Sequence, residues 1–298
     1  MIPGVWPTED DWRRTVPERL AAAVERWGLR VGPEVSGGSV SHVRSVTTAD
    51  GEPAVLKLSF PHREARDESA ALTWWDGRGA VRLLGSDPED PYVLLLERCE
   101  PGTRLGDRDD LGATERLTIG ADAVARLWAA GVPAESPFER LVDVCDEWAD
   151  LAEHRMETLA PPLDPGIVRH GVALLRELPR TAPQEVVVHG DHNPGNVLAA
   201  ERAPWLVIDP KPMTGDPAYD LCPLLMQVDD PFALPDPVSE VVERTALVAD
   251  RTGLDPERIH AWSVARLVES ALWYVSRGEL PEAQDDAARA ARIAALLG

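Results

Sequence analysis

The pattern of apolar and polar residues along the chain changes its period near residue 98. Before that point, short apolar stretches rich in β-branched residues are separated by Gly, Pro and Asp, which is typical of strands and turns. After it, apolar residues mostly recur three and four positions apart, which is typical of helices that bury one face. We therefore predict an α+β protein, with a strand-rich part at residues 1–98 and a mainly helical part at 99–298. The expected strands lie at 30–35, 40–47, 54–58, 80–84 and 92–97.

Start and stop signals place the helices within these two parts. In the first part we expect an irregular arm over Met1–Thr15, a short helix over Pro17–Trp27 and a second helix over Arg63–Trp75. In the second part, Ser136-Pro137-Phe138-Glu139 has the S-x-x-E spacing of a capping box, and it predicts a helix that runs to about Thr158. Further helices are expected at 113–130, 166–178, 217–227, 237–253, 256–278 and from 281 onward.

The composition narrows the classes of partner. The formal net charge is −21, so neither nucleic acid nor an anionic membrane is expected as a partner. An acidic surface suits a cationic small molecule, and it also suits solubility alone. Cys99, Cys145 and Cys222 show no CxxC pair and no metal-ligand spacing, so we expect reduced thiols and a cytoplasmic location. No uninterrupted apolar run approaches the length of a transmembrane helix.

The stretch 186–198 carries the strongest chemical signal. It begins as a short buried strand and opens into a loop with His189, Asp191 and Asn196, and a second predicted strand ends on Asp209. An Asp in a loop rich in Gly and Pro can serve turn formation alone. The H-x-D-x-x-x-x-N spacing between two strands, with a further Asp after the second strand, favours phosphoryl transfer instead. In that chemistry Asp191 accepts the proton of an acceptor hydroxyl, while Asn196 and Asp209 hold Mg²⁺.

Three segments in this order resemble the aminoglycoside phosphotransferase family, in particular its streptomycin 6-phosphotransferase and hydroxyurea phosphotransferase branch. They are His189-Gly190-Asp191 through Asn196, Ile208-Asp209-Pro210-Lys211 and Gly215-Asp216-Pro217-Ala218-Tyr219-Asp220. The resemblance spans roughly residues 32–224. It implies a two-lobed, protein-kinase-like fold with an antiparallel-sheet N-lobe, a helical C-lobe, and direct transfer of the ATP γ-phosphate with Mg²⁺. Pro-Lys replaces the usual Phe-Gly after Asp209, which puts activation-loop switching in doubt.

The residues expected to hold the nucleotide phosphates precede the predicted linker. Gly37 and Gly38 lie before a V-x-K strand, where a flexible loop could cover phosphates with backbone N–H groups, although a Gly pair is also an ordinary turn. Lys57 is embedded among apolar residues and needs a partner, because burying a lone ammonium is costly. The resemblance implies that Lys57 positions the α- and β-phosphates. Glu68 is the favoured partner and Glu64 the alternative, and a surface salt-bridge ladder is the simpler reading of that helix.

The resemblance assigns further positions in the chain to supporting roles. Backbone groups of the linker, Glu97, Arg98 and Cys99, are expected to hydrogen-bond adenine. His189 and Asp216 are expected to support the catalytic loop without touching the substrate, although Asp216 also suits ordinary helix capping.

The acceptor is the least specified part of the prediction. Lys211 suits either an exposed turn or a contact with phosphate, and Glu269 is the candidate for binding a cationic acceptor because family members use acidic residues of C-terminal helices. The best prediction is streptomycin, the alternatives being hydroxyurea, an amino sugar or another hydroxylated metabolite. A non-catalytic kinase-like binding module is the rival class, but a binding module needs no proton acceptor such as Asp191. A zinc site at His189 and His192 lacks further suitable ligands.

Overall fold

The computed structural model describes residues 7–35 and 41–297, and its contacts divide the chain into two compact units. The N-terminal unit comprises Met1–Thr103 and Leu198–Pro212, and the C-terminal unit comprises Arg104–Val197 and Met213–Gly298. The segment at 198–212 thus groups with the N-terminal residues, although it follows the predicted catalytic loop in the sequence. The nucleotide-binding and acceptor-binding roles predicted for 1–98 and 99–298 stay predictions.

Within the described residues, the N-terminal unit contains the expected five-stranded antiparallel sheet, and the structure shows its strand order to be β1-β2-β3-β5-β4. Its strands are β1 (Arg30–Glu34), β2 (Ser41–Thr47), β3 (Pro53–Ser59), β4 (Leu83–Ser86) and β5 (Val93–Glu97). β4 begins later than expected, because Ala80 forms an isolated parallel bridge with Val207 instead of joining the sheet. The short 198–212 segment therefore also borders the region before β4.

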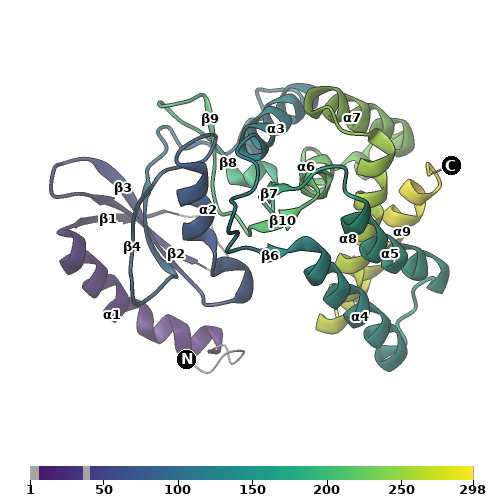
Figure 1. Ribbon diagram of the computed structural model, residues 1–298, viewed down its shortest axis with the longest axis horizontal. Helices are drawn as coiled ribbons and strands as arrows, with labels where there is room; N and C mark the ends of the chain where they lie inside the picture. The colour runs from purple at the N-terminus through teal and green to yellow at the C-terminus, as the bar shows by residue number, and fades with distance from the viewer. Residues whose placement is uncertain (1–6, 36–40, 298) are drawn as a thin grey trace. The chain divides into compact units, whose positions relative to one another are not determined.

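The two faces of β3 have different environments. Leu56 and Leu58 face a core that includes Ala23 of α1 (Glu9–Trp27) and Leu29, the residue that follows the αL cap of this helix at Gly28. Because successive side chains of a strand point to opposite faces, Lys57 lies on the other side. Figure 1 shows α1 and α2 (Glu68–Trp75) flanking this sheet. A strand covered on one face by α1 therefore presents its lysine toward α2.

Helix α1 is longer than the sequence analysis predicts, and the expected arm over Met1–Thr15 is wrong for its described part. The Thr8 side chain caps the helix by accepting from the Asp11 amide, and three acidic residues occupy the first turn, where they are favoured by the helix dipole. Pro17 lies inside the helix and not at its start. The capping and the burial of Trp12 at 3% exposure outweigh the hydrogen bond that Pro17 cannot donate.

The segment predicted as one helix over Arg63–Trp75 consists of two pieces. A 3-10 turn covers Arg63–Ala65, and α2 begins only at Glu68. Glu68 is consequently the first residue of the helix, whereas the sequence analysis put it in the middle. At that position its carboxylate lies at the positive end of the helix dipole.

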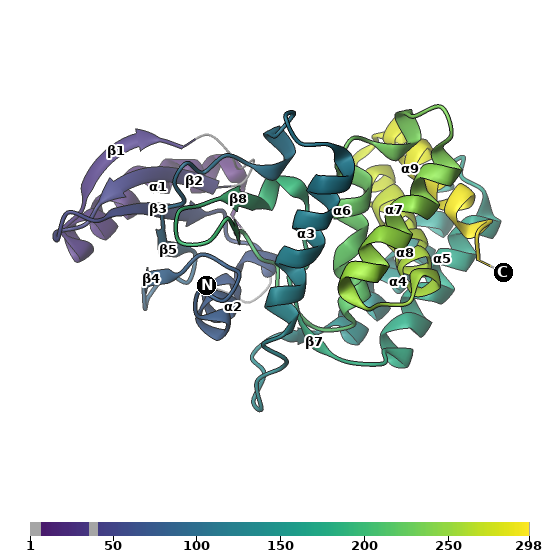
Figure 2. The ribbon, with the colours of Figure 1, turned by 90° about the horizontal axis from the view of Figure 1, so that it is seen from above.

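The C-terminal unit is mainly helical, as predicted. Its α-helices are α3 (Ala113–Trp128), α4 (Leu141–Leu159), α5 (Pro165–Glu177), α6 (Leu221–Gln227), α7 (Pro237–Thr252), α8 (Pro256–Arg277) and α9 (Leu280–Ala294). Short 3-10 turns cover Leu105–Asp107, Leu178–Thr181, Pro194–Asn196, Pro217–Asp220 and Pro231–Ala233. Helix α8 is buried along most of its length and packs against α5 and α9, as Figure 2 shows for α9. It is the main internal support of this unit.

Short strands frame the loop that holds the candidate catalytic residues. β7 (Val186–Val188) pairs with β10 (Met213–Gly215), which also pairs with β6 (Glu139–Arg140). β8 (Val197–Ala199) and β9 (Trp205–Val207) form a separate hairpin. The loop at 189–196 thus leaves one short strand and enters another.

The helix predicted to begin at Ser136 begins at Leu141 instead. Glu139 and Arg140 form β6, which pairs in parallel with β10, and the Ser136 hydroxyl lies 2.9 Å from the Thr214 hydroxyl. Strand pairing keeps the backbone extended at the positions that the capping-box spacing would make helical. The local signal is therefore overruled by a tertiary partner.

None of the helices in the described part of the chain combines the length and the apolar character that crossing a bilayer requires.

Candidate active site

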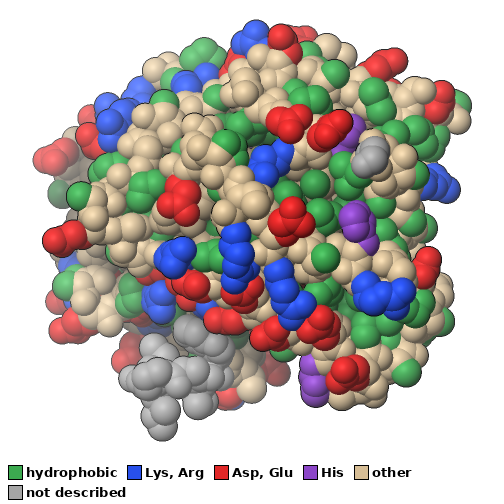
Figure 3. Space-filling model, turned by 45° about the vertical axis from the view of Figure 1, so that its right-hand side comes forward, with side chains coloured by type: hydrophobic (Ala, Val, Ile, Leu, Met, Phe, Trp, Pro, Cys, Tyr) green, Lys and Arg blue, Asp and Glu red, His purple; other side chains and the backbone are tan. Residues whose placement is uncertain are grey.

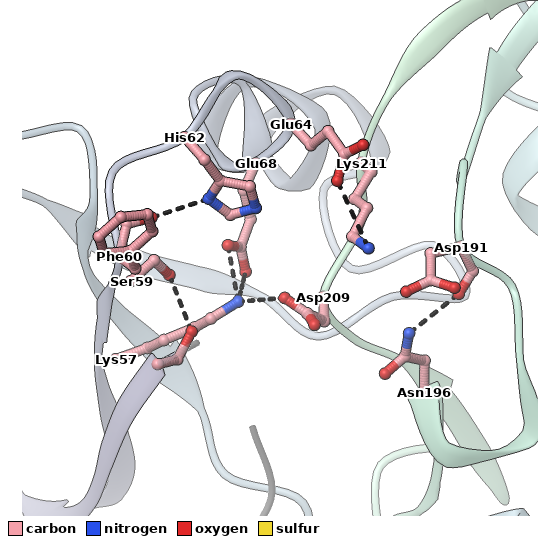
Figure 4. Close-up of polar contacts among 11 residues, drawn as sticks. Lys57, Ser59, Phe60, His62, Glu64, Glu68, Asp191, Asn196, Asp209 and Lys211 are labelled. Atoms are coloured by element: carbon pink, nitrogen blue, oxygen red, sulfur yellow. Dashed lines mark hydrogen bonds and ion pairs between the residues drawn. The ribbon is translucent and has the colours of Figure 1, made fainter. Parts of the chain in front are cut away.

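Asp191 lies in the loop after β7, where neighbouring amides fix both its carboxylate and its backbone. Asn193 Nδ2 donates to Asp191 Oδ1 over 3.1 Å. Figure 4 shows the second bond, in which Asn196 Nδ2 donates to the Asp191 carbonyl over 2.9 Å. Asn193 is in turn placed by its Oδ1, which accepts from the Gly195 amide over 2.9 Å. The spacing between Asp191 and Asn196 therefore corresponds to a direct contact. Asn193 was not singled out in the sequence, although Asn two residues after an Asp in such a loop often bonds locally.

The backbone just before Asp191 is held by a buried carboxylate, that of Asp220. Its Oδ2 accepts from the His189 amide and its Oδ1 from the Gly190 amide, both over 2.8 Å. Trp128 Nε1 of α3 donates to Oδ2 over 2.9 Å. Burial raises the pKa of Asp220, while His189 and these donors act in the opposite direction. A carboxylate with three donors thus fixes the start of the loop.

Asp216, which was expected to support the loop, makes its hydrogen bonds elsewhere. Its Oδ2 accepts from Arg258 Nε and from Trp262 Nε1 of α8, both over 2.6 Å, and its Oδ1 accepts from the Ala218 amide over 3.1 Å. Asp216 therefore attaches the turn at Pro217–Asp220 to α8. Asp220 is the residue that hydrogen-bonds the loop backbone, and the supporting role predicted for Asp216, which would act through this turn, stays a prediction.

The two loop histidines are both buried and differ in their contacts. His189 Nδ1 accepts from the Asp191 amide over 3.2 Å, so this side chain supports the backbone of the candidate base. His192 Nε2 lies 2.9 Å from the Gly120 carbonyl of α3, which makes that nitrogen the protonated one of a neutral ring. Burial, and to a lesser degree the neighbouring His189, lowers the pKa of His192 to about 3.

In the N-terminal unit, Lys57 contacts two carboxylates. Its Nζ lies 2.7 Å from both oxygens of Glu68 and 2.5 Å from Asp209 Oδ1 (Figure 4). Lys57 is 7% exposed and Glu68 1% exposed. The favoured partner in the sequence analysis, Glu68, is thus the one that Lys57 contacts, and Asp209 joins the pair from the 198–212 segment.

The charges of this cluster depend on one another. Burial lowers the pKa of Lys57, but the Glu68 and Asp209 carboxylates outweigh burial and leave the pKa raised. Burial also raises the pKa of Glu68 to about 7, and Asp209 adds to this while Lys57 opposes it. Lys57 consequently keeps its proton at neutral pH. Of its two carboxylate partners, Glu68 is buried and Asp209 is about half exposed.

Glu64, the alternative partner of Lys57, pairs with Lys211. The two side chains lie 3.6 Å apart between Nζ and Oε2, and both are partly exposed (Figure 4). Asp209, two residues before Lys211, has a φ of 59°, a left-handed conformation that is uncommon outside Gly. The turn therefore directs Asp209 toward Lys57 and Lys211 toward Glu64, at a backbone cost of about 1–3 kcal/mol.

The predicted linker residues follow β5. The Glu97 carboxylate accepts from Arg202 over 2.6 and 2.8 Å and from the Arg82 amide over 2.9 Å, so this side chain has a structural role. Arg98 pairs with Glu100 over 2.9 Å. Cys99 is buried, which raises the pKa of its thiol to about 12. Gly37 and Gly38, predicted to cover the phosphates, lie outside the described residues.

Glu269 lies on α8 and is partly buried. Burial raises the pKa of Cys145 on α4; Arg266 opposes this rise and the Glu269 charge adds to it. The Glu269 carboxylate is therefore within electrostatic range of α4, inside the C-terminal unit.

The oxygen donors at the predicted metal positions suit Mg²⁺, a hard cation that prefers carboxylate and amide oxygens. Because Asn196 donates through Nδ2 to the Asp191 carbonyl, its Oδ1 is the atom left for a cation. The Asp209 carboxylate is about half exposed, and its Oδ1 accepts from the Lys57 ammonium. Asn196 and Asp209 stay the predicted ligands of the ion.

Comparison with known proteins identifies a family of kinases. The family described as aminoglycoside/hydroxyurea antibiotic resistance kinase matches residues 26–278. A hydroxyurea phosphotransferase from Kitasatospora aureofaciens is 39% identical over 90% of this chain and 76% of its own length. A streptomycin 6-kinase from Streptomyces glaucescens is 35% identical over 90% of this chain and 85% of its own length.

Solved structures show the same fold at low sequence identity. A choline kinase from Cryptosporidium parvum has a TM-score of 0.64 at 11% identity, covering 94% of this chain and 96% of its own. The aminoglycoside phosphotransferase APH(4)-Ia, in a ternary complex with ADP and hygromycin B, has a TM-score of 0.61 at 16% identity, covering 94% of this chain and 97% of its own. The predicted kinase-like fold is confirmed. The chain therefore belongs to the aminoglycoside/hydroxyurea antibiotic resistance kinase family and is an ATP-dependent phosphotransferase.

Proposed function

We propose that this phosphotransferase transfers the γ-phosphate of ATP to a hydroxyl of streptomycin. The observation that carries the proposal is the similarity to a streptomycin 6-kinase over 90% of the chain. The net charge of −21 supports it, because the guanidinium groups of streptomycin are drawn to an acidic protein. We place the reaction in the cytoplasm, where ATP is available and where the free thiols of this chain would stay reduced.

Asp191 has the role of proton acceptor in the proposed reaction. Its carboxylate orients the acceptor hydroxyl and takes its proton as the oxygen attacks the γ-phosphorus. Asn193 keeps this carboxylate in one orientation, and the bonds from Asn196 and His189 fix its backbone. A positioned acceptor of this kind contributes about 10²–10⁴-fold to a rate.

The nucleotide phosphates are held by residues of the Lys57 cluster. Lys57 contacts the α- and β-phosphates while Glu68 keeps its ammonium in place. Asn196 and Asp209 would hold Mg²⁺, and the ion would supply positive charge that stabilises the phosphoryl oxygens. Lys211 supplies a further positive charge for phosphate, exchanging its contact with Glu64 for the nucleotide.

The linker and the phosphate loop complete the nucleotide site in this proposal. The Glu97 amide already donates to the Arg82 carbonyl over 2.9 Å, so the contacts with adenine fall to the Glu97 carbonyl and to the backbone of Arg98 and Cys99. Gly37 and Gly38 cover the phosphates with backbone N–H groups.

Glu269 binds a cationic group of the acceptor. Its place on α8, the same buried helix that supports the turn at Pro217–Asp220, gives the carboxylate a rigid base. A carboxylate on a rigid helix positions an acceptor better than one on a loop.

Hydroxyurea is the second candidate acceptor. The specific observation in its favour is the 39% identity to a hydroxyurea phosphotransferase over 90% of this chain. Hydroxyurea is small and uncharged, so its binding does not depend on Glu269 or on the net charge.

The test is a coupled assay of ADP release with MgATP and either streptomycin or hydroxyurea, together with mass spectrometry of the product. We expect streptomycin to gain the mass of one phosphoryl group. Turnover of hydroxyurea with none of streptomycin would overturn the acceptor assignment and leave the kinase assignment in place.

Asp191→Asn is the control variant for the chemistry. Nucleotide binding should stay close to that of the parent, because Asp191 is expected to contact the acceptor and not ATP. The value of kcat should fall by about 10²-fold or more. A variant with the kcat of the parent would remove Asp191 from its role, and tight nucleotide binding without any turnover by the parent would favour a binding module.

A further inference from the structure

One face of α8 contacts the structures around the catalytic loop at three successive turns. Arg258 and Trp262 bind Asp216, as described above. One turn later, Arg266 Nη1 donates to the Gly190 carbonyl and to the Tyr219 carbonyl, both over 3.2 Å. Gly190 directly precedes Asp191, so α8 reaches the backbone of the candidate base.

The peptide between Gly190 and Asp191 is held at both of its polar ends. Arg266 donates to its carbonyl oxygen over 3.2 Å, and its amide, that of Asp191, donates to His189 Nδ1 over 3.2 Å. The preceding peptide is held by Asp220, which accepts from the Gly190 amide. Gly190 has a φ of 85°, a conformation that a residue with a Cβ rarely adopts. Gly adopts this conformation without strain, so the bonds to the Gly190 amide and carbonyl, and not side-chain sterics, select the orientation of the peptide.

Arg266 is an unusual residue for stability alone. Its guanidinium lies 4.1 Å from the centre of the Tyr219 ring, yet no carboxylate lies within ion-pair distance of it among the described residues. Burial lowers the pKa of Arg266, but surrounding groups that include Asp191 and Asp220 leave it raised. Arg266 is partly buried, and even partial burial of a cation without a direct anionic partner has a cost that an apolar side chain on Tyr219 would avoid.

We propose that Arg266 is a positioning residue for the phosphoryl transfer, because its bond to the Gly190 carbonyl sets the orientation of the Gly190–Asp191 peptide and thereby the place of the Asp191 carboxylate. The proposal rests on the role of Asp191 given under Proposed function. The Asp191 charge is also among the groups that keep the pKa of Arg266 raised, so the two side chains attract each other electrostatically. In this assignment Arg266 contacts neither the nucleotide nor the acceptor, and it acts only through the position of Asp191.

The test compares Arg266→Met and Arg266→Lys with the parent in steady-state kinetics. Loss of the bond lets the loop peptide rotate, and a displacement of about 1 Å lowers a rate by roughly 10²-fold. We therefore expect Arg266→Met to lower kcat by about 10²-fold while the KM for ATP changes by less than about 3-fold. Arg266→Lys keeps a charged donor near both carbonyls and should recover a large part of kcat.

Arg244 provides a matched control on α7. It is 3% exposed, and its Nη1 likewise donates to two backbone carbonyls, those of Leu225 and Val228, away from the catalytic loop. Arg244→Met should lower the melting temperature and leave kcat within about 3-fold of the parent at temperatures where both are folded. An equal loss of kcat in Arg244→Met and Arg266→Met would show that general destabilisation explains the result and would overturn the proposal.

A double-mutant cycle with Asp191→Asn separates positioning from structure. If Arg266 acts through Asp191, Arg266→Met should cost much less when Asp191 is already Asn, so the two losses in kcat should not add. Losses that add would overturn the proposal, as would an Arg266→Met variant that keeps the kcat of the parent. The assay uses whichever acceptor the protein turns over, or the slow transfer to water. Failure of the Asp191 assignment is recognised separately, by the activity of Asp191→Asn alone.

Discussion

His192 is buried as a neutral ring, and this makes the stability of the protein depend on pH. Its pKa is about 3 in the folded protein and about 6.5 in an unfolded chain. Below pH 6.5 the unfolded chain therefore binds a proton that the folded protein does not. The contribution of His192 to stability is complete above pH 6.5 and is lost progressively as the pH falls toward 3.

Replacing His192 by Gln should remove this dependence while keeping a donor for the Gly120 carbonyl. Between pH 7 and 5.5 the parent should lose about 1 kcal/mol more free energy of unfolding than His192→Gln. Urea unfolding at the two pH values measures the difference, and other histidines affect both proteins equally. An equal loss in the two proteins would show that His192 is protonated in the folded state.

The Lys57 cluster predicts a difference between two neighbouring glutamates. Glu68→Gln removes the carboxylate that holds Lys57 through both oxygens, so kcat/KM for ATP should fall by about 10-fold or more. Glu64→Gln loses only the exposed contact with Lys211, and its kcat/KM should stay within about 3-fold of the parent. Steady-state kinetics with varied ATP measures both, and the reverse ranking would mean that Glu64 is the functional partner.

At the residue scale, the sequence identifies candidate site residues where the proposed chemistry needs one particular side chain. Asp191, Asn196, Asp209 and Lys57 could be named because their spacing and order are specific. The carboxylate that holds the loop could not, since Asp216 and Asp220 both precede or begin a helical segment and only the tertiary structure shows that Asp220 reaches the loop backbone.

Two helices of the C-terminal unit approach closely where Gly171 of α5 lies against Val268 of α8. A Cβ at position 171 would lie 2.5–2.7 Å from the Val268 side chain, much closer than ordinary contact. Gly171→Ala should therefore destabilise the protein by about 1–3 kcal/mol through overpacking, despite the higher helix propensity of Ala. Thermal or urea unfolding of the variant measures this change.

A second substitution tests whether the close approach is the cause. Val268→Ala leaves room for the added methyl group, so Gly171→Ala should cost clearly less free energy of unfolding in that background. An unchanged cost in the Val268→Ala protein would mean that α5 and α8 do not approach at this point.

At the element scale, helices whose start is marked by an Asp-Pro pair could be predicted from the sequence. Asp236 and Asp255 each cap a helix with Pro at its first position, as expected. The prediction of a helix start fails where the local signal competes with strand pairing to a distant segment or with a stronger cap earlier in the chain. Strand pairing of Glu139 overrules the capping box at Ser136, and the Thr8 cap extends α1 through Pro17.

The net charge of the whole molecule predicts a dependence on salt. In Figure 3, acidic side chains are distributed over the visible face with basic ones between them, and the formal total is −21. Attraction of a multiply charged cation by such a field is weakened at high ionic strength. The KM for streptomycin should consequently rise by several-fold between about 0.05 and 0.5 M salt. Hydroxyurea, which is uncharged, is the control acceptor, and a KM for streptomycin that does not change would argue against electrostatic attraction.

The N-terminal unit is built from two stretches that are distant in the sequence, 1–103 and 198–212. The second stretch supplies Asp209, a partner of Lys57, and Val207, whose backbone pairs with Gly79 and Val81 over 2.9 and 3.1 Å. The ends meet directly, since the Ala199 amide donates to the Thr103 carbonyl over 2.9 Å.

A ribosome therefore delivers the parts of this unit at different times. At about 5–20 residues per second, residues 104–212 need roughly 5 to 20 s to be synthesised after the first stretch is complete. During that interval the nascent chain has a strand edge near Gly79 without its partner and a buried lysine that lacks Asp209. Chaperones or mispaired strands can occupy such an edge. Synthesis that stalls before residue 212 leaves the N-terminal unit unfinished, however long its first 103 residues have had to fold.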